Sequence, residues 1–179
     1  CVARQDPLEK YKGFEFMFEA LRILGPQLSG IHLNLVGAGG DQPRLMQLAQ
    51  QMGVQEQVTF WGSLPSEDLA AAYRDCSVFV MPSRNEGFGI VFLEAMRHGR
   101  PCIGGNHGGT KELIDEGDDG YLVDYGDSHG LARRIAALAL DPALCARMGE
   151  AGRRKVAGAF SAEAFRRRYL ELIRGGGQQ

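Results

Sequence analysis

Short apolar runs alternate along the chain with longer amphipathic segments, and most of the runs end at a glycine or a proline. Continuous apolar runs of this length are typical of strands that are buried on both faces, as in a parallel sheet. The pattern therefore predicts short parallel strands that end in glycine-rich or proline-containing loops. The runs lie at residues 31–36, 58–61, 78–81, 102–103 and 121–123.

Between these runs, apolar residues recur at spacings of three and four, which indicates helices with one buried face. The first stripe runs from Phe14 to Leu28. Asp141 followed by Pro142 is typical of a helix N-cap and first turn, and Ser161 predicts the cap of a last helix. The other stripes are Leu45–Leu48–Met52, Leu131–Ile135–Leu138 and Phe165–Tyr169–Leu172.

Strand and helix in alternation predict an α/β fold, a Rossmann-like parallel sheet with helices on both faces. From Gly130 onward the helical patterns follow one another without a strand between them, so we expect a C-terminal helical appendage. The chain shows no internal repeat and no long linker. We therefore expect residues 1–179 to form one domain.

Composition places the chain among soluble globular proteins, with 44% hydrophobic and 23% charged residues in a length of 179. The longest apolar run, residues 76–81, is far shorter than the roughly 20 residues that a membrane helix needs. The chain opens at Cys1 with neither a methionine nor an apolar leader, which indicates a piece of a longer protein. The spacing of the four cysteines predicts no metal site and favours free thiols in a reducing compartment.

Charged residues are distributed unevenly along the chain, although the net charge is only −2. From Arg147 onward, 8 basic residues face only 3 acidic ones. Such a tail can bind nucleic acid, an anionic membrane or an acidic domain, but a solvated helix face is the favoured interpretation. No nucleic-acid-binding motif accompanies it, so we expect no nucleic-acid partner.

Glycine is about twice as frequent as its usual share of roughly 7%, with 25 residues, which indicates loops with close backbone approaches. The loop at residues 37–41 resembles a dinucleotide fingerprint, but Gln42 stands where the third glycine would be. A tight strand-to-helix turn is the favoured interpretation there. In open α/β sheets ligands bind at the carboxyl ends of the strands, where these loops lie.

The loop at residues 82–89 is more informative, because it follows a buried strand and opens a helix. Its glycines and the helix N-terminus together predict an anion site. Glu86 lies in the loop and Glu94 in the helix, and residues 88 to 94 span about 9 Å. That separation suits two carboxylates that bind the hydroxyls of two sugars on either side of a phosphate group. It suits a glycosidase pair less well.

Two further loops carry candidate residues. Residues 4–14 place Arg4, Lys10 and Lys12 around a turn, where cations can neutralise a diphosphate. Residues 104–112 place glycine amides before a helix, again on the predicted anion side. His107 in this loop is expected to be solvated or hydrogen-bonded rather than catalytic.

In order and spacing, these blocks resemble the retaining glycosyltransferases of family 4, the group 1 transferases, which have the GT-B fold. The resemblance extends from Arg4 to about Val123, and two glutamates eight residues apart around Gly-Phe-Gly are its most specific feature. Ala3 departs from the family, which often has glycine there, and the stretch from Arg4 to Lys12 is longer than in many members. The matching residues are Arg4, Lys12, Gly13, Phe14, Gly62, Pro82, Ser83, Glu86, Gly87, Phe88, Gly89, Glu94, Ala95, Met96, Gly99, Pro101, Gly108, Gly109, Glu112 and Gly120.

The resemblance implies that the chain is the C-terminal, donor-binding domain of a two-domain enzyme, without the N-terminal acceptor domain. Such an enzyme transfers a sugar, of the hexosyl type, from a nucleotide-diphosphate-sugar to an acceptor hydroxyl with retention, and the isolated fragment is expected to be inactive. The resemblance implies no cofactor and no metal. It also implies a cytoplasmic location, with the inner face of the membrane as the place of any peripheral contact of the full-length enzyme.

By the same resemblance, Arg4, Lys12 and Glu86 are expected to be the catalytic residues. Arg4 and Lys12 would hold the donor diphosphate, with Lys10 competing for the role of Lys12, and Glu86 would contact sugar hydroxyls. Glu94 would accept hydrogen bonds from the ribose. The remaining nucleotide-binding positions are Gly62, near the base, and Gly87, Phe88, Gly89 and Ile90, whose amides would meet the phosphate and the sugar.

Three alternatives remain open from the sequence. Other GT-B enzymes, such as nucleotide-sugar epimerases and starch or sucrose synthases, share parts of the pattern. A nicotinamide-binding domain is disfavoured by the broken glycine fingerprint. A non-catalytic nucleotide-binding module is disfavoured by the intact pair of Glu86 and Glu94. The sequence does not identify the base, the sugar or the acceptor.

Overall fold

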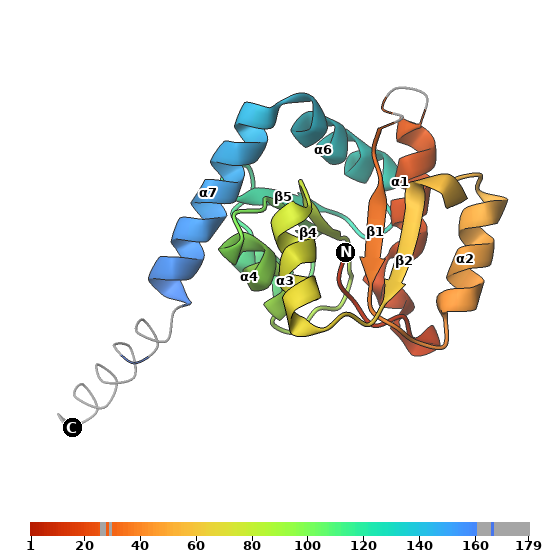
Figure 1. The fold of residues 1–179 in the computed structure, drawn as a ribbon. Helices are drawn as coiled ribbons and strands as arrows, with labels where there is room; N and C mark the ends of the chain where they lie inside the picture. The colour runs from red at the N-terminus through yellow and green to blue at the C-terminus, as the bar shows by residue number, and fades with distance from the viewer. Residues whose placement is uncertain (26–27, 29, 161–165, 167–179) are drawn as a thin grey trace.

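Strands and helices alternate up to Val123, after which two helices follow one another (Figure 1). The structure, a computed structural model, describes residues 1–25, 28, 30–160 and 166. The strands are β1 (Leu33–Val36), β2 (Val58–Gly62), β3 (Phe79–Met81), β4 (Cys102–Gly105) and β5 (Gly120–Val123). The α-helices are α1 (Phe14–Leu24), α2 (Gln42–Gln51), α3 (Ser66–Asp75), α4 (Ile90–Arg97), α5 (Thr110–Leu113), α6 (Ser128–Leu140) and α7 (Pro142–Ala159). Two short 3-10 helices are η1 (Pro7–Lys12) and η2 (Gln55–Gln57).

Every predicted strand has its counterpart in this fold, and the strands of each sheet are parallel. The strands form two sheets rather than the predicted single one: β1 pairs with β2, and β3, β4 and β5 form the other in that order. The N-terminal segment runs beside β1, where Val2 forms a parallel bridge with Val36. The N–H of Ala3 donates to the carbonyl of Val36 at 2.9 Å.

A cavity of about 410 Å³ lies between the beginning of β1 and the residues that lead into β3. Met17 and Leu21 of α1 and Ile135 of α6 contribute apolar side chains to its wall, together with Cys1. The two sheets are therefore not joined by hydrogen bonds at this level. Apolar packing joins them instead, because one hydrophobic core contains Leu35 and Val58 of the first sheet and Val80 and Ile103 of the second.

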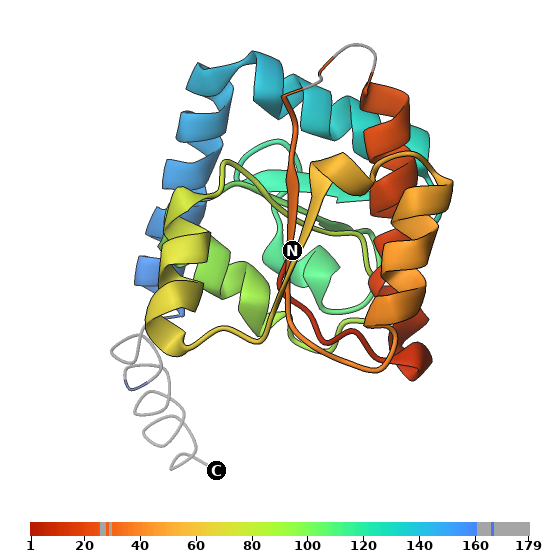
Figure 2. The same ribbon diagram turned by 45° about the vertical axis from the view of Figure 1, so that its right-hand side comes forward.

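The strands β3, β4 and β5 are buried on both faces because each one contributes to two cores, whereas β1 and β2 contribute to one core only. Phe79 and Met81 point into one core, whereas Val80 between them points into the other. The first core contains the apolar faces of α1, α2 and α6, and the second contains those of α3, α4 and α5. In Figure 2, α1 and α2 lie on one side of the sheets and α3 and α4 on the other. Burial on both faces explains why β3 is continuously apolar.

The C-terminal helices pack onto this frame: α6 lies against α1, and α7 lies against α4. Asp127 accepts a hydrogen bond from the N–H of Gly130 at 2.7 Å and so caps α6. Asp141 accepts one from the N–H of Leu144 at 2.9 Å and caps α7, as predicted. The predicted last helix, from its Ser161 cap onward, lies outside the described residues apart from Arg166.

We expect Asp141→Ala to lower the free energy of unfolding by about 1 kcal/mol, because the first turn of α7 loses its side-chain acceptor. Asp141→Asn keeps a side-chain oxygen at the cap and should retain most of that stability. Urea denaturation of the three proteins measures the difference. Equal losses in both variants would assign the effect to the aspartate charge at the helix N-terminus instead.

Candidate functional site

Three loops meet at the carboxyl ends of the strands, toward which the arrows of β1 and β2 point in Figure 1. The first loop contains η1, the second runs from β3 to α4, and the third runs from β4 to α5. The N–H of Arg84 in the second loop donates to the carbonyl of Tyr11 in the first at 2.9 Å. Residues from three distant parts of the sequence therefore share one edge of the fold.

Lys12 and Glu86 meet directly at this edge. Lys12 Nζ lies 2.9 Å from Glu86 Oε2, and the two side chains are only 13% and 16% exposed. Gly13 adopts a left-handed backbone, with φ of 80°, and an added β-carbon there would lie 2.8 Å from the carbonyl oxygen of Pro82. This close approach explains why glycine follows Lys12, and it brings the ammonium group against the second loop.

Arg4 lies elsewhere in the first loop. Its guanidinium pairs with Glu9 and is 68% exposed, and this hydrogen bond raises the pKa of the arginine. Lys10 is exposed, and its side chain forms no ion pair within the described residues. Of the three predicted cations, only Lys12 contacts a predicted carboxylate. The signal for the Arg4–Glu9 pair was present in the sequence, as opposite charges within one turn-forming segment.

The Gly-Phe-Gly segment forms the predicted start of a helix. Gly89 has φ of 75° and precedes the first residue of α4, Ile90. The large side chains of Phe88 and Ile90 are 56% and 63% exposed. Gly87 has open space where a β-carbon would be. The first N–H groups of a helix have no partner within the helix, so this open terminus can receive an anion.

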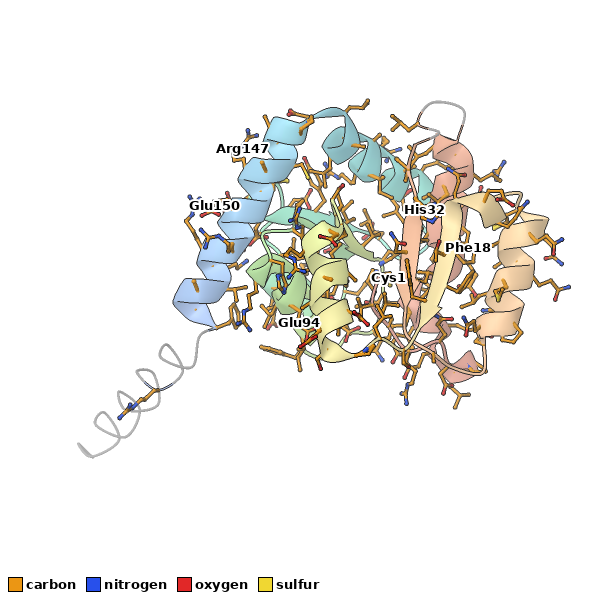
Figure 3. All side chains as sticks on the ribbon, in the orientation of Figure 1. Cys1, Phe18, His32, Glu94, Arg147 and Glu150 are labelled. Carbon is orange, nitrogen blue, oxygen red and sulfur yellow. The ribbon has the colours of Figure 1, made fainter. Side chains whose placement is uncertain are left out.

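Glu94 lies one turn into α4, as predicted, and a side chain of α3 forms a hydrogen bond with its carboxylate. Figure 3 labels the side chain of Glu94. The hydroxyl of Tyr73 donates to Glu94 Oε2 at 2.8 Å. Burial, together with this bond, raises the pKa of Tyr73, so its hydroxyl stays protonated. Neither α3 nor the role of Tyr73 was predicted from the sequence. The signal available was the apolar pair Leu69 and Tyr73, four residues apart after Ser66.

The glycines at the end of β4 and in the third loop pack against the second loop, a role that differs from the predicted one of presenting amides to an anion. A β-carbon on Gly105 would collide with the carbonyl of Ser83, and one on Gly109 with that of Gly87. The N–H of Gly109 donates to the carbonyl of Glu86 at 3.0 Å, so this amide is already used inside the protein. These glycines support the loop that carries Glu86, and the Gly109 amide is occupied by that contact.

Two expectations for other loop residues are confirmed. The loop at residues 37–41 connects β1 directly to α2, which is the tight strand-to-helix turn favoured for it, and Gly37 and Gly39 in this loop approach the backbone of residues 3–5. His107 accepts a hydrogen bond from the N–H of Tyr125 at 3.3 Å, so it is hydrogen-bonded as expected. Gly62 ends β2 with φ of 65° and has open space around it.

Within the described part of the chain, no cluster of three or more His, Cys, Asp or Glu side chains is arranged to hold a metal ion. None of the helices described there has both the length and the apolar character needed to cross a membrane. All four cysteines carry free thiols.

Residues 6–155 match the glycosyl transferases group 1 family. Since the match covers most of the chain, the chain belongs to this family. The fold agrees, because an α/β domain with parallel strands and helices on both faces is the Rossmann-like architecture of its structural neighbours, including HepE.

Curated relatives and a solved structure are similar over nearly the whole chain. The lipopolysaccharide core biosynthesis glycosyltransferase LpsE of Rhizobium meliloti is 35% identical over 90% of this chain and 46% of its own length. A GDP-mannose-dependent α-(1-6)-phosphatidylinositol monomannoside mannosyltransferase of Mycobacterium tuberculosis is 33% identical over 98% of this chain and 46% of its own length. The structure of HepE from Anabaena in complex with UDP has a TM-score of 0.85 at 26% identity, covering 97% of this chain and 47% of that one. The chain thus spans about half the length of these proteins.

We expect Gly109→Ala to lower the free energy of unfolding by about 1 to 3 kcal/mol, because its β-carbon would force the loop of Glu86 to move. Gly158→Ala is the matched control, since Gly158 lies in α7 with open space around it. The control should be neutral or stabilise by up to about 1 kcal/mol. Urea denaturation measures both, and an unchanged Gly109→Ala would show that the loops separate freely.

Proposed function

We propose that the chain is the donor-binding domain of a retaining glycosyltransferase that transfers a sugar from a nucleoside diphosphate to an acceptor hydroxyl. The observation that carries the proposal is the meeting of Lys12 and Glu86 beside the N-terminus of α4, with Glu94 one turn further along. A cation, two carboxylates and a helix N-terminus suit a diphosphate flanked by two sugars. Family membership and the UDP bound to HepE support the same ligand class.

The proposed roles follow the position of each group along the donor. Lys12 and the exposed guanidinium of Arg4 neutralise the diphosphate, and Glu86 accepts hydrogen bonds from the transferred sugar. Glu94 accepts hydrogen bonds from the ribose. The amides of residues 87–90 meet the phosphate and the sugar, and the open backbone at Gly62 lies near the base.

In this proposal the bond between the anomeric carbon and the diphosphate oxygen breaks, and the acceptor oxygen bonds to the same face of the sugar while its proton passes to the departing diphosphate oxygen. Negative charge grows on the departing nucleoside diphosphate as the bond breaks. Lys12, Arg4 and the N-terminus of α4 are fixed positive groups that stabilise this charge, which is electrostatic catalysis. Glu86 stabilises the positive charge that develops on the sugar ring.

Titration of the chain with UDP, GDP, ADP and NAD tests the proposal. We expect one nucleoside diphosphate to bind and NAD not to bind, with ligand-observed NMR as the readout for weak affinity. Because Lys12 and Arg4 already supply positive charge, the affinity in EDTA should equal that with added magnesium or manganese. Binding of NAD alone, or of no nucleotide, would overturn the proposal, and a strong metal requirement would overturn the assignment of the diphosphate site.

Two substitutions separate the proposed roles of the glutamates. Glu94→Ala should weaken the nucleoside diphosphate and the nucleotide-sugar by similar factors, because the ribose is common to both. Glu86→Ala should weaken only the nucleotide-sugar, since the bare diphosphate lacks the sugar and Lys12 loses its competing carboxylate. Each lost charged hydrogen bond corresponds to about 1.5 to 3 kcal/mol. Calorimetry with both ligands measures the effects, and an equal loss for both ligands in Glu86→Ala would contradict the placement of the sugar.

A further inference from the structure

A single buried hydroxyl holds the carboxylate of Glu94. Tyr73 is only 3% exposed, and its hydroxyl donates to Glu94 Oε2 at 2.8 Å. Within the described residues, the Glu94 side chain forms no ion pair and no other hydrogen bond. The position of this carboxylate therefore depends on α3, a helix that contributes none of the matching family residues.

The ring of Tyr73 is fixed by its neighbours. It stacks on His98 with ring centroids 6.0 Å apart and an interplanar angle of 8°. On the core side it lies 5.9 Å from the ring of Phe79, at an angle of 46°. Because packing fixes the ring, the direction of the hydroxyl is fixed before any ligand arrives.

We propose that Tyr73 is a positioning residue for Glu94: it occupies one carboxylate oxygen and leaves the other directed at the ribose hydroxyls. The inference rests on the proposed function, in which Glu94 receives the ribose. A glutamate on a helix surface samples several rotamers, and ordering it on binding reduces affinity. A carboxylate that is already held in place avoids that loss, as supporting hydrogen bonds do in other binding sites.

The competing interpretation is that Tyr73 only fills the core between α3 and α4. Core filling depends on the ring, whereas positioning depends on the hydroxyl. Tyr73→Phe keeps the ring and removes the hydroxyl, so it separates the two. Tyr121→Phe is the matched control, because Tyr121 is a buried tyrosine of β5 whose hydroxyl makes no hydrogen bond within the described residues.

The experiment combines protein variants with two ligands. The ligands are the nucleoside diphosphate that binds most tightly among UDP, GDP and ADP, and its 2′,3′-dideoxy analogue, which lacks the ribose hydroxyls. Tyr73→Phe should weaken the natural ligand by about two- to tenfold and leave the dideoxy analogue unchanged. In a Glu94→Ala background, Tyr73→Phe should cause no further loss. Tyr121→Phe should leave both affinities unchanged.

Glu94→Gln provides a second variant, because it keeps an oxygen that Tyr73 can bond. Tyr73→Phe should still weaken ribose binding in that background. Equal weakening of both ligands by Tyr73→Phe, or full additivity with Glu94→Ala, would overturn the inference. A wild-type chain that binds no nucleotide would instead overturn the proposed function. If the wild type binds and Glu94→Ala weakens binding while Tyr73→Phe does not, only the role of Tyr73 is wrong.

Discussion

The site depends on one constraint: three loops at the carboxyl ends of the strands meet backbone to backbone, closer than a β-carbon allows. Three glycines approach the loop after β3 in this way: Gly13 at the end of η1, Gly105 at the end of β4, and Gly109 in the third loop. Contact on both sides fixes that loop, which carries Glu86. The same contact places Lys12, the neighbour of Gly13, within hydrogen-bond distance of the carboxylate. Glycine at these positions is thus a packing requirement first, and it serves ligand binding by fixing the side chains beside it.

The packed strands and helices from which the loops start keep these close loop contacts in place. The strands β3, β4 and β5, of three or four residues each, are buried on both faces, and helices from two separate cores cover them. Dense packing on both sides leaves the strand ends little freedom, so the loops begin from fixed points. The C-terminal helices add to this frame: Lys155 of α7 bonds Asp119 at 2.7 Å and Asp115 at 2.9 Å, which ties α7 to the segment between α5 and β5.

Local patterns were enough to predict much of the fold. The apolar runs marked every strand, and glycines before an apolar helix placed Glu94 in α4, because both signals lie within a few residues. Contacts between distant residues could not be predicted in this way. The bond from Tyr73 to Glu94 spans 21 positions, and it belongs to a helix whose apolar stripe is short. The support that Gly109 gives to the second loop likewise depends on tertiary packing, which the sequence shows only as a glycine-rich stretch.

The Lys12–Glu86 pair also bears on which ligand the site favours. Both side chains are largely removed from water, and leaving either charge without a partner in such surroundings is costly. In the proposed assignment, a diphosphate that draws Lys12 toward itself leaves Glu86 in need of new donors. The hydroxyls of an attached sugar supply them, whereas a bare nucleoside diphosphate does not. The ion pair therefore couples recognition of the diphosphate to recognition of the sugar, so that the complete donor is favoured over the product that remains after transfer.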